Sequence, residues 1–264
     1  MKRIIKSILH KLISGKKGFS DLTVLSGQAR GIKLRIDLRK EASYFLGTYD
    51  QWIFKRINFS NYIKPGMCLW DCGAYIGYYT AVFRNCIKDD GLIYTFEASY
   101  KNYNSLKELP NLNNWENVKI INIAVGPENS KIQFSNNLGG SNGPVGLSKI
   151  YSHDLEIIEV DCKGVDEIIA LGIAYAPDFI KFDIESAEIY ALNNGDNLFS
   201  TKRPLILLEI HGEEAFKSTG LFLEKYNYRA AYVGDFPDPE KWYHSGSDLK
   251  EIGFIPHMLF CFPN

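Results

Sequence analysis

Two glycines and a glutamate lie at the spacing with which α/β proteins bind a nucleoside cofactor. Gly73 and Gly77 follow the apolar run Met67–Trp70, which is typical of a buried parallel strand, and they bracket a sharp turn into a helix. Glycine at such a turn tolerates positive φ and lets the backbone approach a ligand. Glu97 ends the next apolar run about twenty residues beyond Gly77, where a carboxylate accepts hydrogen bonds from ribose hydroxyls. A surface carboxylate is the plain alternative for Glu97, but the combination predicts a nucleoside site.

Three carboxylates crowd a second strand end. Asp183, Glu185 and Glu188 follow or end the predicted strand 179–183. Negative side chains stabilise the N-terminal end of the following helix, so these carboxylates need no catalytic role. This structural role accounts for the positions of Glu185 and Glu188 better than for that of Asp183. Asp183 ends a buried strand, where an isolated carboxylate is costly unless a cation or hydrogen-bond donors meet it. A positively charged ligand would satisfy Asp183, so we predict that it faces the cofactor.

Glu209 and His211 close the next predicted strand, 204–210, and add two titratable groups to the same edge. Histidine titrates near neutrality and accepts a proton from a substrate hydroxyl, while Glu209 orients it or binds a metal. We select His211 as the candidate general base, with Glu185 or Asp183 as second choices. The alternative is that His211 has a purely structural role and only makes hydrogen bonds. Asp183, Glu185 and Glu209 are also an alternative Mg²⁺ site, although no metal ligand is assigned.

The composition of the chain argues against several classes of protein. Lys and Arg number 30 and Asp and Glu 31, which gives a net charge of -1 and no basic field for nucleic acid. The five cysteines are an odd number without a C-x-x-C pair, which indicates reduced thiols. No apolar run approaches the ~20 residues of a membrane span, and the N-terminus lacks the features of a signal peptide. We therefore expect a cytoplasmic protein that does not bind nucleic acid.

Alternating strands and helices must bring these groups together. In a doubly wound parallel sheet the carboxyl ends of the strands meet at one edge, where a cofactor binds. Ala124, near the end of the third strand, leaves room there for a flat base such as adenine. We expect the last two strands to form an antiparallel edge. The predicted strands are 67–70, 92–96, 118–125, 179–183, 204–210, 228–233 and 258–262, and the predicted helices are 78–88, 101–109, 165–171 and 215–226.

Residues 1–62 are predicted to be additions to a single catalytic domain formed by residues 63–264. Residues 1–18 have the pattern of a basic amphipathic helix, which either packs its apolar stripe on the domain or lies on a membrane surface. Residues 22–37 predict a β-hairpin. Residues 44–62 have helical spacing and many aromatic side chains, which either cover one end of the site or only pack as ordinary core and edge residues. No substrate contact is assigned there.

Six motifs in order resemble the FkbM family of S-adenosylmethionine-dependent methyltransferases, over about residues 45–262. The motifs are Lys64–Gly66, Asp71–Thr80, Phe96–Glu97, Asn122–Gly126, Ile180–Glu188 and Leu208–His211. Three positions depart from the family: Tyr75 stands where Asn is usual, Ala98 where Pro is common, and Ser186 where Gly is usual. None of these removes a charge, so we expect cofactor binding to survive with an altered loop shape.

The resemblance implies an α/β fold of the class I methyltransferase type. Its sheet is Rossmann-like, seven-stranded and mainly parallel, with the last strand antiparallel and helices on both faces. The implied cofactor is S-adenosyl-L-methionine. The candidate cofactor-binding residues are Asp71, Gly73, Ala74, Tyr75, Gly77, Glu97, Ala98, Ser99, Ala124 and Asp183, and the candidate catalytic residues are His211 and Glu185.

The implied function is O-methylation of a sugar hydroxyl, or of a glycan or glycolipid, in a biosynthetic pathway. The protein must align the acceptor oxygen with the carbon–sulfur bond and exclude water. A lipid-linked substrate would agree with contact of residues 1–18 with the inner membrane face. Two alternatives stay open. One is an NAD-dependent oxidoreductase, although the full G-x-G-x-x-G pattern is missing, and the other is a degenerate domain that binds the cofactor without turnover.

Overall fold

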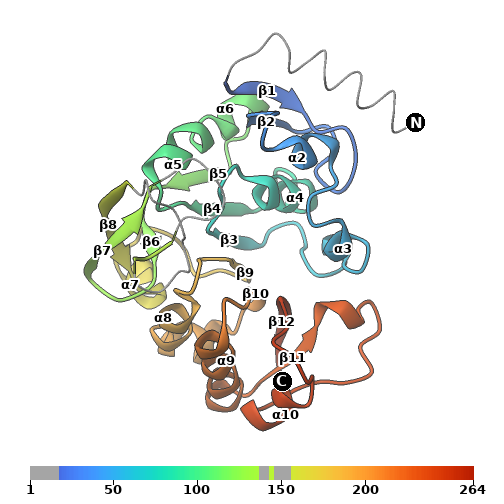
Figure 1. Ribbon diagram of the computed structural model, residues 1–264, viewed down its shortest axis with the longest axis vertical. Coiled ribbons are helices and arrows are strands. Elements are labelled where there is room, and N and C mark those ends of the chain that lie inside the picture. Colours follow the sequence, from blue (N-terminus) through green and yellow to red (C-terminus); the bar gives the residue numbers. More distant parts are fainter. Residues whose placement is uncertain (1–17, 137–142, 146–155) are drawn as a thin grey trace.

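A seven-stranded central sheet organises the computed structural model, which describes residues 18–136, 143–145 and 156–264 (Figure 1). In these residues the strand order is β11, β12, β10, β9, β3, β4, β5. All neighbours from β10 to β5 are parallel, whereas β12 is antiparallel to both β10 and β11. This confirms the predicted sheet with its antiparallel last strand. The strands are β3 Cys68–Cys72, β4 Leu92–Phe96, β5 Val118–Ile121, β9 Phe179–Phe182, β10 Leu205–Glu209, β11 Tyr228–Tyr232 and β12 Met258–Pro263.

Helices cover both faces of this sheet because successive strand residues point to opposite sides. Leu69 and Phe179 belong to one hydrophobic core, which includes α4, whereas Trp70 and Ile180 belong to a second core, which includes α7, α8 and α9. All four residues of β9 are buried, as expected for a central parallel strand. The helices are α4 Tyr78–Ile87, α5 Tyr100–Leu106, α6 Leu109–Asn113, α7 Val165–Ala170, α8 Glu188–Asn193, α9 Glu213–Tyr226 and α10 Gly246–Lys250.

The predicted N-terminal hairpin is confirmed. Strands β1 Ser20–Thr23 and β2 Lys33–Ile36 pair antiparallel. Leu34 is fully buried in the same core as Leu69, so the hairpin packs directly on the layer that covers one face of the sheet. Of the predicted amphipathic helix over residues 1–18, residues 1–17 lie outside the described part of the chain. Within the described part, no helix has the length and apolarity to cross a membrane.

The region with helical spacing, residues 44–62, forms three short helices and not one continuous helix. These are α2 Ala42–Leu46, α3 Gln51–Phe54 and the 3-10 turn η1 Phe59–Asn61. Gly47 ends α2 with a φ of 71°, and Asp50 precedes α3 with a φ of 47°. A Cβ on Gly47 would lie 1.9 Å from the carbonyl oxygen of Ser26. The contact between Gly47 and the hairpin loop therefore requires the break.

The predicted strand over residues 118–125 is divided between two sheets. β5 ends at Ile121, and the following β6 Ala124–Val125 pairs with β8 Ile157–Lys163 in a three-stranded sheet that β7 Ser130–Ser135 completes. Asn122 lies at the break. Its amide donates to the carbonyl oxygens of Glu97 and Ala98 at 2.7 and 3.1 Å, which holds the turn against the end of β4.

We expect the substitution Phe260→Ala to lower the free energy of unfolding by about 3–5 kcal/mol, because it leaves a cavity in the core. Phe260 of β12 is fully buried, and its ring contacts the rings of Tyr62, Phe179 and Phe236. Urea unfolding followed by circular dichroism measures the loss. Phe254→Ala is the matched control, since Phe254 is 54% exposed and its loss should be much smaller. Equal losses for the two variants would contradict this packing.

Candidate cofactor and active site

The loop between β3 and α4 forms the predicted glycine turn. Gly73 and Gly77 have φ values of 79° and 81°. The N–H groups of Gly73 and Ala74 donate to the carbonyl of Phe96 at 3.0 and 3.2 Å, which ties the turn to β4. A Cβ on Gly73 would lie 1.8 Å from the carbonyl oxygen of Asp183, so glycine permits the close approach of the β9 loop. Gly77 faces α5 and α6, where a Cβ would lie 2.5 Å from the nearest side chain.

Glu97 follows β4 and is almost fully buried beside this turn. Its Oε2 accepts the backbone N–H of Tyr75 at 2.8 Å, and its Oε1 accepts the backbone N–H of Ser99 at 2.9 Å and the amide of Asn102 at 3.5 Å. Burial raises the pKa of Glu97 to about 7, although these hydrogen bonds oppose the rise. Because a carboxylate oxygen has two lone pairs, Oε2 can still accept a ribose hydroxyl.

Tyr75 and Ser99, two of the predicted cofactor contacts, lie on either side of Glu97. Tyr75 lines the pocket with a φ of 52°, a left-handed conformation that Asn, the usual residue here, tolerates better than Tyr. The Tyr75 hydroxyl donates to Glu41 of the N-terminal segment. Ser99 is not among the residues that line the pocket; its hydroxyl caps α5 by accepting the N–H of Asn102 at 3.3 Å. Ser99 therefore contributes to the site through its N–H on Glu97.

Small and apolar side chains line the pocket next to Glu97. Ala98 and Ala124 are both buried and line it together with Ile123 and Phe134. Two methyl side chains leave the space that a flat base requires, and the neighbouring apolar groups suit its faces. Ala98 and Ala124 thus line the same pocket as Glu97, Ala124 from β6 and not from the central sheet, and their contact with a cofactor stays a prediction.

A buried ammonium group, that of Lys181, joins the carboxyl ends of β3 and β9. It is 1% exposed, and its Nζ lies 2.9 Å from Asp183 Oδ2, 3.9 Å from Asp71 Oδ1 and 4.9 Å from the ring centre of Tyr79. Burial opposes its charge, but the two carboxylates outweigh burial and raise the pKa of Lys181. The same ammonium lowers the pKa of Asp183 against the effect of burial.

Lys181 therefore supplies a cation to Asp183, and the role of Asp183 toward the cofactor stays a prediction. Sequence reasoning missed Lys181. The signal was a single lysine inside the otherwise apolar strand 179–182, since a lysine is almost never fully buried unless it is paired.

Glu185 enters the pocket from a strained turn between β9 and α8. Glu185 and the next residue, Ser186, have φ values of 53° and 78°, which explains why glycine is usual at the position of Ser186. The Glu185 carboxylate lines the pocket, and burial raises its pKa to about 7. Backbone strain of this kind concentrates at functional sites.

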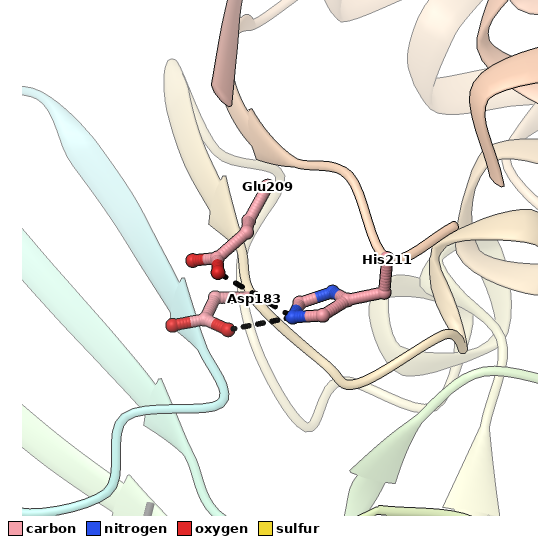
Figure 2. A group of neighbouring side chains, drawn as sticks. All are labelled: Asp183, Glu209 and His211. Carbon is pink, nitrogen blue, oxygen red and sulfur yellow. Dashed lines mark ion pairs between the residues drawn. The ribbon is translucent and has the colours of Figure 1, made fainter. Parts of the chain in front are cut away.

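The ring of His211, which follows β10, lies among four carboxylates, and Figure 2 shows two of them directed at the ring. Nδ1 is 2.8 Å from Glu188 Oε1, and Nε2 is 3.4 Å from Glu209, 3.8 Å from Asp183 and 3.7 Å from Glu185. Burial lowers the pKa of His211, but Glu188 and Glu209 together raise it to about 11. These carboxylates favour the protonated ring, which opposes the base role of His211, and that role stays a prediction.

One pocket connects the nucleoside side to the acidic side. Glu97 and Ala124 line one part of it, and Glu185 lines another. Tyr44 and Tyr49 of the N-terminal segment line it too, and their rings stack with centres 4.1 Å apart. The sequence allows this segment to cover one end of the site, but nothing in the spacing of the two tyrosines identifies them individually as pocket residues. Glu209 and His211 are not among the lining residues.

The comparisons with known proteins give one family match and several solved structures of low sequence identity. The family model described as a methyltransferase FkbM domain matches residues 71–230. A crystal structure of methyltransferase FkbM from Methylobacillus flagellatus is 16% identical with a TM-score of 0.46, over 99% of this chain and 60% of that chain. The chain thus spans about 60% of the length of that protein.

Two further solved structures are similar at lower identity. Precorrin-6y C5,15-methyltransferase from Geobacter metallireducens is 9% identical with a TM-score of 0.44, over 82% of this chain and 87% of that chain. Fibrillarin from Aeropyrum pernix, solved with bound S-adenosyl-L-methionine, is 11% identical with a TM-score of 0.41, over 76% of this chain and 67% of that chain. The search of curated proteins found no match.

We expect Gly73→Ala to weaken the binding of S-adenosylhomocysteine, the product form of the predicted cofactor, by at least about tenfold, because a Cβ would push the β9 loop away. Isothermal titration calorimetry measures the affinity. Gly66→Ala is the matched control: Gly66 has a φ of 86°, but a Cβ there meets nothing within 4 Å. Both variants lose about 1–2 kcal/mol of stability from positive φ, and only Gly73→Ala should lose affinity. Unchanged affinity in Gly73→Ala would remove the turn from the cofactor site.

Cofactor affinity should also depend on pH through Glu97. The ionised carboxylate accepts ribose hydroxyls, whereas its pKa of about 7 leaves much of it protonated in mildly acidic solution. Affinity for S-adenosylhomocysteine is therefore expected to rise by up to about tenfold per pH unit below neutrality and to level off above it. In Glu97→Gln the affinity should be weaker and this rise should disappear. The same rise in Glu97→Gln would show that another group titrates.

Proposed function

Because the chain belongs to the FkbM methyltransferase family, we propose that it binds S-adenosyl-L-methionine and methylates a hydroxyl oxygen of a sugar, a glycan or a glycolipid. One observation carries the proposal: a single pocket joins the glycine turn and Glu97 to the carboxylate of Glu185 and the rings of Tyr44 and Tyr49. Such a pocket can hold a nucleoside cofactor and an acceptor side by side.

The cofactor half of the pocket fits an adenosyl group. Gly73 lines this half, Glu97 keeps a lone pair for the ribose, and Ala98 and Ala124 leave space for the base. When bound, S-adenosyl-L-methionine supplies a methyl group on a positively charged sulfur, which takes the electron pair of the carbon–sulfur bond. The protein has to hold the acceptor oxygen in line and to keep water out.

The other half of the pocket suits an acceptor that carries several hydroxyl groups. The stacked rings of Tyr44 and Tyr49 offer flat apolar faces, against which the C–H groups of a sugar ring can pack. Glu185 offers an acceptor for hydroxyl hydrogens. Aromatic faces beside a carboxylate therefore support a sugar-like acceptor.

Glu185 is placed better than His211 to accept the hydroxyl proton. Its carboxylate lines the pocket that the acceptor enters, whereas His211 contacts Glu185 from outside the lining, with Nε2 3.7 Å from Glu185 Oε2. The proton passes from the acceptor oxygen to the Glu185 carboxylate while that oxygen bonds to the methyl carbon. His211 then acts as a positioning group for Glu185.

A methyl-transfer assay with labelled cofactor tests this proposal on sugar nucleotides, lipid-linked sugars and cell extract. We expect label in a sugar-containing product, and we expect Glu185→Gln to lower kcat by about 10²–10⁴-fold while it still binds S-adenosylhomocysteine. The matched control is Glu214→Gln, since the Glu214 side chain is 73% exposed on α9 and should keep full activity.

Three other outcomes would overturn parts of the proposal. Full activity of Glu185→Gln removes this residue as the base. Binding of NAD without S-adenosylhomocysteine favours the oxidoreductase alternative. Binding of S-adenosylhomocysteine with no labelled product from any acceptor class favours the degenerate interaction domain.

A further inference from the structure

We propose that Asp183, Glu209 and His211 bind one divalent transition-metal cation such as Mn²⁺ at the edge of the cofactor pocket. The binding itself does not depend on the proposed function. Its use rests on that function, because a cation at this place would polarise an acceptor hydroxyl next to Glu185.

The donor atoms of these three residues are spaced as one ion requires. One oxygen of each carboxylate and one ring nitrogen all lie within 4.8 Å of one another. His211 Nε2 is 3.4 Å from Glu209 Oε1 and 3.8 Å from Asp183 Oδ1, and Figure 2 shows the three groups converging. Octahedral ligands of a small divalent ion lie about 3 Å apart when adjacent and about 4 Å when opposite. A small contraction of the site would bring all three into contact with one ion.

Neighbouring side chains hold two of the three donors, those of His211 and Asp183, in position. Glu188, whose side chain is fully buried, binds His211 Nδ1 at 2.8 Å, so that Nε2 is the nitrogen that faces the two carboxylates. Lys181 holds Asp183 Oδ2 at 2.9 Å and leaves Oδ1 to face the ring. Metal-binding histidines commonly give their other ring nitrogen to a carboxylate in this way.

Carboxylates outnumber the basic groups around His211, although Lys181 pairs with Asp183 at 2.9 Å and His257 Nε2 lies 3.4 Å from Glu209 Oε1. Four carboxylates, those of Asp183, Glu185, Glu188 and Glu209, lie within 4.0 Å of the His211 ring nitrogens. The second oxygen of Glu188 is buried without a hydrogen-bond partner among the described residues. Buried carboxylates are costly unless they are paired or coordinate a metal. A divalent ion would bind His211 Nε2 only after that nitrogen releases its proton to solvent, so the exchange of one proton for a divalent ion would add one net positive charge to the cluster.

The donor set favours a transition metal over Mg²⁺. Mg²⁺ prefers a shell of oxygen atoms and keeps much of its water. An imidazole nitrogen with two carboxylates instead suits Mn²⁺ or a later divalent metal, and three protein donors leave positions open for water or for acceptor hydroxyls. We therefore expect Mn²⁺ to bind more tightly than Mg²⁺.

Titration of the chelator-treated full chain with Mn²⁺, followed by electron paramagnetic resonance of the free ion, tests the site. We expect one Mn²⁺ per chain, displaced by Mg²⁺ only at more than about tenfold higher concentration. Glu209→Gln should weaken Mn²⁺ binding by more than about tenfold, and Glu188→Gln by about 10–100-fold through the orientation of the histidine. Glu214→Gln, on the exposed face of α9, should bind as the wild type does.

Two outcomes would overturn the metal site: no uptake of Mn²⁺ by the wild type at millimolar concentration, or equal uptake by the wild type and Glu209→Gln. In either case Lys181 and the histidine rings around the cluster suffice for these carboxylates without a metal ion. S-adenosylhomocysteine affinity, measured on the same samples, shows whether each variant is folded. It also separates the two proposals, since cofactor binding without Mn²⁺ overturns the metal site alone, and Mn²⁺ binding without cofactor overturns the proposed function alone.

Discussion

The buried ammonium of Lys181 is the interaction on which the active-site edge of the sheet depends. It lies between Asp183 on its own strand end and Asp71 on β3, and it packs over the ring of Tyr79. A carboxylate buried without a cation is costly. The Lys181 ammonium is a single cation that both of these carboxylates share. The strand ends of β3 and β9 can therefore meet, and the contact of Gly73 with the Asp183 carbonyl follows from that approach.

Glu97 and Glu185 show how one physical effect serves two purposes in this pocket. Burial raises the pKa of both to about 7. Backbone N–H groups of Tyr75 and Ser99 fix the Glu97 carboxylate, so the lone pair that it keeps for a ligand has a defined direction. Glu185 instead lies on a turn with positive φ, close to the His211 ring. The first arrangement suits the holding of a ligand, and the second suits the exchange of a proton.

The N-terminal segment builds part of the pocket although it lies outside the residues that match the family. The match begins at residue 71, whereas Tyr44 and Tyr49 come from α2 and the turn that follows it. Glu41 of the same segment accepts a hydrogen bond from the hydroxyl of Tyr75, the residue that replaces the usual Asn. The segment and the altered turn are thus coupled by direct contact. If the acceptor binds there, its selection depends on a part of the chain that the family model does not cover.

The sequence by itself determined the features that depend on neighbours along the chain. Apolar runs and glycine turns predicted the central strands, and the spacing from Gly77 to Glu97 predicted the nucleoside side of the pocket, because one strand, turn and helix have fixed dimensions. Tertiary structure decided the rest. The region with helical spacing over residues 44–62 is broken where Gly47 packs against the Ser26 carbonyl. The predicted strand over residues 118–125 is divided where the Asn122 amide donates to the Glu97 carbonyl at the end of β4. Whether His211 is neutral or charged depends likewise on carboxylates from two different strand ends. These contacts join residues far apart in sequence, so no local pattern contains them.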